Sequence, residues 1–124
     1  MKKRFLSLTL ACLAVSTFGC NANYTQVKAR EEATKHSCDW YQKCGEIGTG
    51  KTYVSLDDCT TTQAAFWNDQ WKAGDCDNRI TPAALNSCLA FIDNGTCGDY
   101  FQHLVTVLSQ CSEKRVCNAG ADGG

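Results

Sequence analysis

The feature that most constrains the fold of this chain is its number of cysteines. Ten occur in 124 residues, and Cys12 lies in an apolar leader that export would remove. Cys20 stands at the end of that leader, and eight more follow it: Cys38, Cys44, Cys59, Cys76, Cys88, Cys97, Cys111 and Cys117. An even set of this size in a small exported chain indicates a scaffold of disulfides, which supplements a core that is marginal at this length.

The N-terminus has the three parts of a secretory signal. Lys2, Lys3 and Arg4 form a basic start, and the run FLSLTLACLAVSTF, residues 5–18, carries no charge. This run is shorter than the about 20 apolar residues that a transmembrane helix needs. The pattern therefore predicts a signal peptide over residues 1–19 and export from the cytoplasm.

The residues before Cys20 resemble a bacterial lipobox, with Thr17 and Phe18 in place of the usual Leu and Ala or Ser. In such a sequence the cysteine is lipidated and becomes the new N-terminus. Lipidation of Cys20 would also leave an even number of cysteines for pairing. We therefore predict a lipid anchor at Cys20; the alternative is cleavage elsewhere, with Cys20 as a free thiol.

The charge of the mature chain excludes one class of function. Without the leader, nine Lys and Arg stand against 13 Asp and Glu, which gives a formal charge of −4. The absence of a basic stripe argues against binding to nucleic acid. The negative charge gives no attraction to anionic lipid, so membrane association would depend on the lipid at Cys20. We expect localisation in the bacterial envelope, at the periplasmic or outer-membrane face.

The pattern of the mature chain predicts an all-α fold of about four helices. A tether over residues 20–27 would lead into a disulfide-rich domain over 28–117, and residues 118–124 would form a flexible tail. Expected helices cover residues 26–44, ending at Gly45, then a segment from the N-cap Ser55 to a stop at Gly74, and two more from Thr81 to Asn94 and from Cys97 to Cys111.

Two of these helices carry a clear apolar face. Thr81 and Pro82 form an N-cap and N1 pair, and Ile80 stands where a hydrophobic staple would contact Leu85. The third helix then has apolar residues at i, i+3, i+4 and i+7: Leu85, Cys88, Leu89 and Ile92. On the fourth helix the expected buried face consists of Phe101, Leu104, Leu108 and Cys111.

Disulfide connectivity does not follow from sequence, because eight cysteines allow on the order of a hundred pairings. Cys38 and Cys44 point about 120° apart on one helix, so this helix could be joined to two different neighbours. From the expected helical hairpins we predict the pairs Cys44–Cys59, Cys88–Cys97, Cys76–Cys111 and Cys38–Cys117.

Residues 45–52, GEIGTGKT, match the phosphate-binding P-loop pattern in full. A P-loop follows a buried strand and opens directly into a helix, whereas here a helical pattern precedes the loop and Tyr53-Val54 separate it from the next N-cap. We therefore predict a connecting loop whose glycines provide positive φ angles, and no nucleotide binding.

Other chemistry receives little support from the sequence. No Cys-x-x-Cys pair is present, which disfavours thiol redox catalysis and a zinc site that includes His36 or His103. His36 and Asp39 stand at i and i+3 on the first helix, but a solvent-facing pair is the simpler interpretation. We predict no catalytic residue, no metal and no cofactor.

The aromatic residues offer the best candidate for binding. Trp40, Trp67 and Trp71 could form a binding patch with neighbouring tyrosines and phenylalanines. They could also be the core, because a small disulfide-rich domain has few other large residues to bury. The core is the favoured interpretation.

The mature chain resembles a group of uncharacterised cysteine-rich lipoproteins of myxobacteria, some of which are labelled natural-product-biosynthesis lipoproteins from their gene neighbourhoods. The resemblance rests on the following residues: Cys38-(x5)-Cys44, Ile47-Gly48, Gly50-Lys51, Tyr53-x-Ser55 before Cys59, the Trp67 position, Ala84-Leu85-Asn86-x-Cys88-Leu89-x-x-Ile92 before Cys97, and Cys111-(x5)-Cys117. It implies an envelope lipoprotein and provides no catalytic residue.

Together these observations predict a lipid-anchored, disulfide-joined helical module that binds an unidentified protein or small apolar molecule. Two alternatives remain open. The chain could be an enzyme, or an accessory to one, that acts on a natural product. It could also be a secreted toxin-like or inhibitory protein, which would require Cys20 without lipid.

Overall fold

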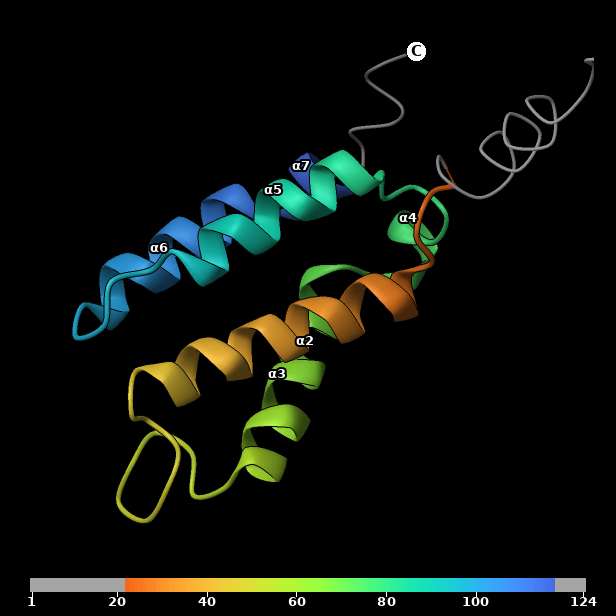
Figure 1. Ribbon diagram of the computed structural model, residues 1–124. Helices are drawn as coiled ribbons and strands as arrows, with labels where there is room; N and C mark the ends of the chain where they lie inside the picture. Colours follow the sequence, from red (N-terminus) through yellow and green to blue (C-terminus); the bar gives the residue numbers. More distant parts are fainter. Residues whose placement is uncertain (1–21, 118–124) are drawn as a thin grey trace, which may run out of the picture.

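The computed structural model describes residues 22–117, which form an all-helical domain (Figure 1). The four main helices are α2 (Gln26–Lys43), α3 (Leu56–Gln70), α5 (Pro82–Asp93) and α6 (Tyr100–Gln110). They confirm the predicted fold class. Two single-turn helices were not expected: α4 (Ala73–Cys76) and α7 (Glu113–Val116). The predicted signal peptide, Cys20 and the tail over residues 118–124 lie outside the described residues.

Local sequence explains where the main helices begin. Each of α2, α3, α5 and α6 has a capping side chain whose oxygen accepts a hydrogen bond from a backbone N–H three residues later. The caps are Thr25, Ser55, Thr81 and Asp99. The end of α2 is also local, because Gly45 follows it with a φ of 74°, a conformation that a glycine adopts without strain.

The helices pack as two pairs (Figure 1). α2 contacts α3 on one side and α5 on the other, and α6 lies beside α5. The core between them contains the largest fully buried side chains: Trp40, Trp67, Trp71, Ile80, Leu85 and Ile92. The three tryptophans are at most 1% exposed, so they form core and not an exposed binding patch. No helix among residues 22–117 is long and apolar enough to cross a membrane.

All eight cysteines of the domain form disulfides, in the pairs Cys38–Cys59, Cys44–Cys97, Cys76–Cys117 and Cys88–Cys111. The predicted pairs Cys44–Cys59, Cys88–Cys97, Cys76–Cys111 and Cys38–Cys117 are therefore wrong in all four bonds. The expectation that α2 would be joined to two different neighbours is confirmed, because Cys38 binds α3 and Cys44 binds the loop before α6.

The pairing follows from tertiary packing. α3 runs at an angle to α2 (Figure 1), so Cys59 in its first turn meets Cys38 and not the end of α2. The loop between these helices folds back on itself through a bridge between Ile47 and Tyr53. A tight hairpin joining Cys44 to Cys59 therefore does not form.

The second helix ends earlier than predicted. Gly74 is not its stop, since α3 ends at Gln70 and Gly74 lies within α4. Trp71 leaves the helical conformation, with φ −121° and ψ 88°. Its indole donates to the carbonyl of Cys111 over 2.8 Å, while Gln26 donates to the carbonyl of Trp71 over 2.6 Å. Two long-range hydrogen bonds thus end the helix at this tryptophan.

The buried face of α6 also differs from the prediction. Phe101, Leu104 and Leu108 are exposed at 78%, 45% and 38%, and only Cys111 of the expected face is buried. The inward positions are instead Tyr100, His103, Val107 and Cys111. The disulfide to Cys88 fixes one end of the helix, and aromatic contacts with Trp40 fix the other, so these tertiary contacts decide its rotation.

The segment expected as a tether, residues 20–27, partly belongs to the folded domain. Tyr24 forms a bridge with Ile80, and its backbone N–H donates to the Ile80 carbonyl over 2.7 Å. Gln26 is only 2% exposed. The chain therefore enters the domain beside the start of α5.

Candidate functional site

An apolar cavity of about 280 Å³ lies where the four main helices meet. α2 and α5 form its floor, α3 and α6 form its walls, and the loop before α3 contributes Tyr53. We call this space the α3–α6 cavity; the residues that line it are Ser37, Tyr41, Tyr53, Thr62, Gln63, Phe66, Trp67, Ile92, His103, Leu104 and Val107. Thr62 and Leu104 are exposed, so they mark its mouth.

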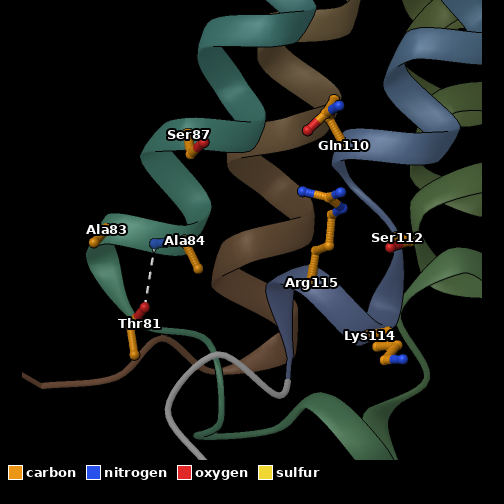
Figure 2. Close-up of a pocket in the computed structure, with 8 residues that line it drawn as sticks. All are labelled: Thr81, Ala83, Ala84, Ser87, Gln110, Ser112, Lys114 and Arg115. Atoms are coloured by element: carbon orange, nitrogen blue, oxygen red, sulfur yellow. Dashed lines mark hydrogen bonds between the residues drawn. The ribbon is translucent and has the colours of Figure 1, made fainter. Parts of the chain in front are cut away.

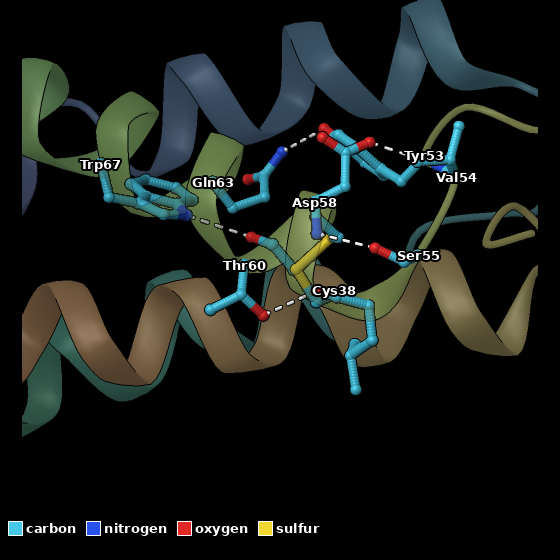
Figure 3. The surroundings of a disulfide bond; sticks show 11 residues. Cys38, Tyr53, Val54, Ser55, Asp58, Thr60, Gln63 and Trp67 are labelled. Carbon is cyan, nitrogen blue, oxygen red and sulfur yellow. Dashed lines mark hydrogen bonds between the residues drawn. A yellow bond between two sulfur atoms is a disulfide. The ribbon is translucent and has the colours of Figure 1, made fainter.

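Buried hydrogen bonds hold the polar groups on the α3 side of the cavity. The Gln63 amide donates to the Tyr53 hydroxyl over 2.9 Å, and the Trp67 indole donates to the Ser37 hydroxyl over 3.1 Å. Figure 3 shows Gln63 and Trp67 on α3 and Tyr53 on the preceding loop, near the disulfide of Cys38. Since Ser37 is adjacent to Cys38, the Cys38–Cys59 bond holds this wall against α2.

Two tyrosines of the lining, Tyr41 and Tyr53, lead toward Tyr100 at the start of α6. Tyr41 packs edge-on against Tyr53, with ring centroids 4.9 Å apart, and is stacked near Tyr100 at 6.1 Å. Burial, followed by the adjacent Tyr53, raises the pKa of Tyr41 well above its ordinary value. Burial and a hydrogen bond to Glu46 raise the pKa of Tyr100 to about 12. Both phenols therefore stay protonated at physiological pH and can donate hydrogen bonds.

His103 stands in the α6 wall as a neutral aromatic group. Its ring is stacked on Trp40 at 3.8 Å, and its Nδ1 is buried without a hydrogen-bond partner. Burial, and secondly the charge of Lys43, lower the pKa of His103. No carboxylate lines the cavity, so His103 has no acidic partner there for general acid–base catalysis.

His36 lies elsewhere and does not pair with Asp39. Its Nδ1 is 2.8 Å and 3.0 Å from the two carboxylate oxygens of Asp93 on α5, while Asp39 binds Lys35 at 2.7 Å. This His–Asp pair joins α2 to α5 beside a separate surface depression that Glu32 also lines. No three His, Cys, Asp or Glu within residues 22–117 are grouped so that they could hold a metal ion.

A wider depression, of about 850 Å³, lies between the start of α5 and the end of α6 (Figure 2). Its lining is mainly small and polar: Thr81, Ala83, Ala84, Ser87, Gln110, Ser112, Lys114 and Arg115. Figure 2 shows Arg115 pointing toward Gln110 and Lys114 pointing away from it. Because the Thr81 hydroxyl caps α5 and no apolar wall encloses the space, it is a weaker site than the α3–α6 cavity.

The Gly-rich loop over residues 45–52 connects two helices, as predicted. The helix α2 precedes it, and the Thr52 hydroxyl donates to the Glu46 carboxylate over 2.8 Å, closing the loop on itself. Gly45, Gly48 and Gly50 take positive φ angles. The strand that a P-loop requires is absent between residues 22 and 45.

Sequence reasoning named one tryptophan of this site but not the cavity. Trp67 lines it, whereas Trp40 lies behind His103 and Trp71 lies deeper in the core. Polar residues at buried positions were the signal that could have indicated it, since Ser37 and Gln63 occupy inward faces of α2 and α3.

Comparison with known families agrees with the cysteine framework. The sequence model of a family of unknown function (DUF6184) matches residues 38–119, which include all four disulfides. The chain belongs to this family. The match also includes α3, α5 and α6, and thus most of the cavity lining. Neither the curated proteins nor the solved structures include a detectable match. Four disulfides in so small a domain indicate an oxidising, extracytoplasmic location.

Proposed function

We propose that this protein is a lipid-anchored binding module of the bacterial envelope, and that its α3–α6 cavity binds a small apolar molecule. The observation that carries the proposal is the cavity itself: a mainly apolar space, open at one mouth and with a few fixed polar groups, is the usual form of a ligand site. Its volume, near the lower limit for drug-sized ligands, suits a molecule of about three rings or fewer.

The walls of the cavity support binding because they are held in place before a ligand arrives. The Cys38–Cys59 disulfide joins α2 to α3, and the Cys88–Cys111 disulfide joins α5 to the end of α6. A preorganised site loses little conformational entropy when it binds. Tyr41 and Ser37 offer hydroxyl groups that could orient a ligand carbonyl or hydroxyl.

The anchor is supported by the sequence before Cys20 and by the pairing of all eight remaining cysteines of the domain. The resemblance to myxobacterial lipoproteins associated with natural-product biosynthesis suggests the chemical class of ligand, an apolar secondary metabolite. Binding, and not catalysis, is proposed because the cavity contains no nucleophile paired with a base.

The test uses the exported chain with Cys20→Ser, so that no lipid micelle takes up an apolar probe. N-phenyl-1-naphthylamine is titrated in, and its fluorescence is expected to rise to saturation at one equivalent. Leu104→Trp, at the cavity mouth, should weaken binding at least about tenfold by filling the entrance.

Val105→Trp is the matched control, because Val105 is the next residue, is similarly exposed at 43%, and does not line the cavity. It should leave the affinity within about twofold, which is near the usual scatter of surface substitutions. Probe fluorescence that does not saturate, or an equal loss of probe affinity in the two variants, would contradict binding in the cavity.

A further inference from the structure

The exposed side of α6 carries an apolar stripe of four residues. Phe101, Leu104, Val105 and Leu108 are exposed at 78%, 45%, 43% and 38%. They stand at i, i+3, i+4 and i+7, the spacing that places side chains on one helix face. The opposite side of α6 packs against α5 and Trp40, so the fold itself does not cover this stripe.

The charge of α6 distinguishes this face from a membrane-binding surface. No residue of Tyr100–Gln110 is an Asp, Glu, Lys or Arg, and the neighbours of the stripe on the helix are neutral, such as Gln102, Thr106 and Ser109. Helices that lie in a membrane interface usually carry Lys or Arg on the polar face. The lack of any Lys or Arg on α6 therefore favours a protein partner over a lipid surface.

A second copy of this chain fits the stripe in both charge and symmetry. A two-fold axis places the same surface of each copy face to face, so a charged residue near the axis would be repelled by the identical residue of the other copy. Helix α6 contains no Asp, Glu, Lys or Arg, so this repulsion is absent from it. In an antiparallel pair of α6 helices, Phe101 of one copy lies opposite Leu108 of the other, and Leu104 lies opposite Val105. We propose that the protein forms a homodimer through these α6 stripes.

The size of the stripe sets the expected strength of the dimer. Standard interfaces use about 20–30 residues on each side, and smaller ones form weak, transient complexes. Four apolar residues of one helix, with their polar neighbours, belong to the weaker class. We expect a dissociation constant on the order of tens of micromolar, which corresponds to rapid exchange between monomer and dimer.

Sedimentation equilibrium of the Cys20→Ser chain, from about 5 to 500 µM, measures this association directly. The wild-type surface should pass from mainly monomer to mainly dimer over that range. Phe101→Glu places two charges in the interface and should weaken association at least about tenfold. Gln102→Glu adds the same charge at the adjacent position, outside the stripe, and should change the dissociation constant less than about threefold.

A mixing experiment tests the antiparallel arrangement. Leu108→Lys alone should also weaken dimerisation. An equimolar mixture of Phe101→Glu and Leu108→Lys should associate more tightly than either variant, because the new carboxylate of one copy then faces the new ammonium group of the other. Circular dichroism establishes that each variant is folded. A monomeric wild type at about 500 µM, or equal weakening by Gln102→Glu, would overturn the dimer.

The mixture has one further outcome: variants that stay monomeric together would overturn the proposed pairing of Phe101 with Leu108. The two proposals can be tested separately, because Phe101 and Leu108 do not line the α3–α6 cavity; of the stripe, Leu104 alone also stands at the cavity mouth. Phe101→Glu should therefore bind N-phenyl-1-naphthylamine as the parent chain does, and loss of probe binding in every variant would count against the ligand site alone.

Discussion

The Cys44–Cys97 disulfide differs from the other three in its exposure to solvent. Cys97 is exposed and Cys44 is half-buried, whereas each of the other six cysteines is at most 3% exposed. Thiol–disulfide exchange requires that a thiolate reach a sulfur atom. Mild reduction should therefore open this bond first, and alkylation followed by peptide mass mapping should place the first two labels on Cys44 and Cys97.

The effect of losing this bond on stability can be worked out from the structure. The two residues are 53 positions apart, and the three remaining disulfides shorten the corresponding loop of the unfolded chain only modestly. The loop entropy then amounts to about 4 kcal/mol in the free energy of unfolding. Because Cys97 is exposed, little packing is lost with the bond. For a domain of this size the expected fall in Tm is about 20 °C.

The assay is urea unfolding of a Cys44→Ser/Cys97→Ser double variant, followed by tryptophan fluorescence. A Cys38→Ser/Cys59→Ser variant is the comparison. Its loop of 21 residues corresponds to an entropy contribution of about 3 kcal/mol. Because its sulfur atoms are buried, the loss of their packing should add to this value. A loss below about 1 kcal/mol on removing Cys44–Cys97, or earlier reduction of a buried bond, would refute the reasoning.

Three further outcomes are expected. The pKa of His103 lies below its unfolded value of about 6.5, so the unfolded chain binds more protons. The free energy of unfolding should therefore fall as the pH drops through 6.5 and level off below the folded-state pKa. Urea unfolding between about pH 5 and 8, with His103→Gln as control, measures this dependence. Gly95→Ala would drive its methyl group into the His103 ring and should cost about 1–3 kcal/mol in urea unfolding, while Gly74→Ala, with open space, should be nearly neutral. Intact mass of the native protein should begin at an acylated Cys20, and an unlipidated mass would exclude the anchor.

Local signals in the sequence predicted most of the helices correctly. Ser55 and Thr81 cap α3 and α5 as expected, and Gly45 follows α2 in a left-handed conformation. These features depend on contacts within about four residues, which any reader of the sequence can evaluate. The buried face of α5 was also correct, since Leu85, Cys88, Leu89 and Ile92 are all buried.

Predictions that depended on distant contacts were wrong. The disulfide pairs followed an assumed hairpin order, but the direction of α3 across α2 brings Cys59 to Cys38. The predicted rotation of α6 buried its most apolar face. In the structure, contacts with Trp40 and the disulfide to Cys88 turn Tyr100, His103 and Cys111 inward instead. A hydrophobic pattern identifies which residues could be buried, and only neighbouring elements select among them.

The all-helical class, the helix starts and the presence of four disulfides were therefore decided by the sequence alone, because caps, glycine conformations and cysteine number act locally or by composition. Tertiary structure alone decided the pairing of the cysteines, the α3–α6 cavity and the exposed stripe on α6. Each of these depends on how helices far apart in the chain cross one another, and that geometry follows from the packing of Trp40, Trp67 and Trp71 in one shared core.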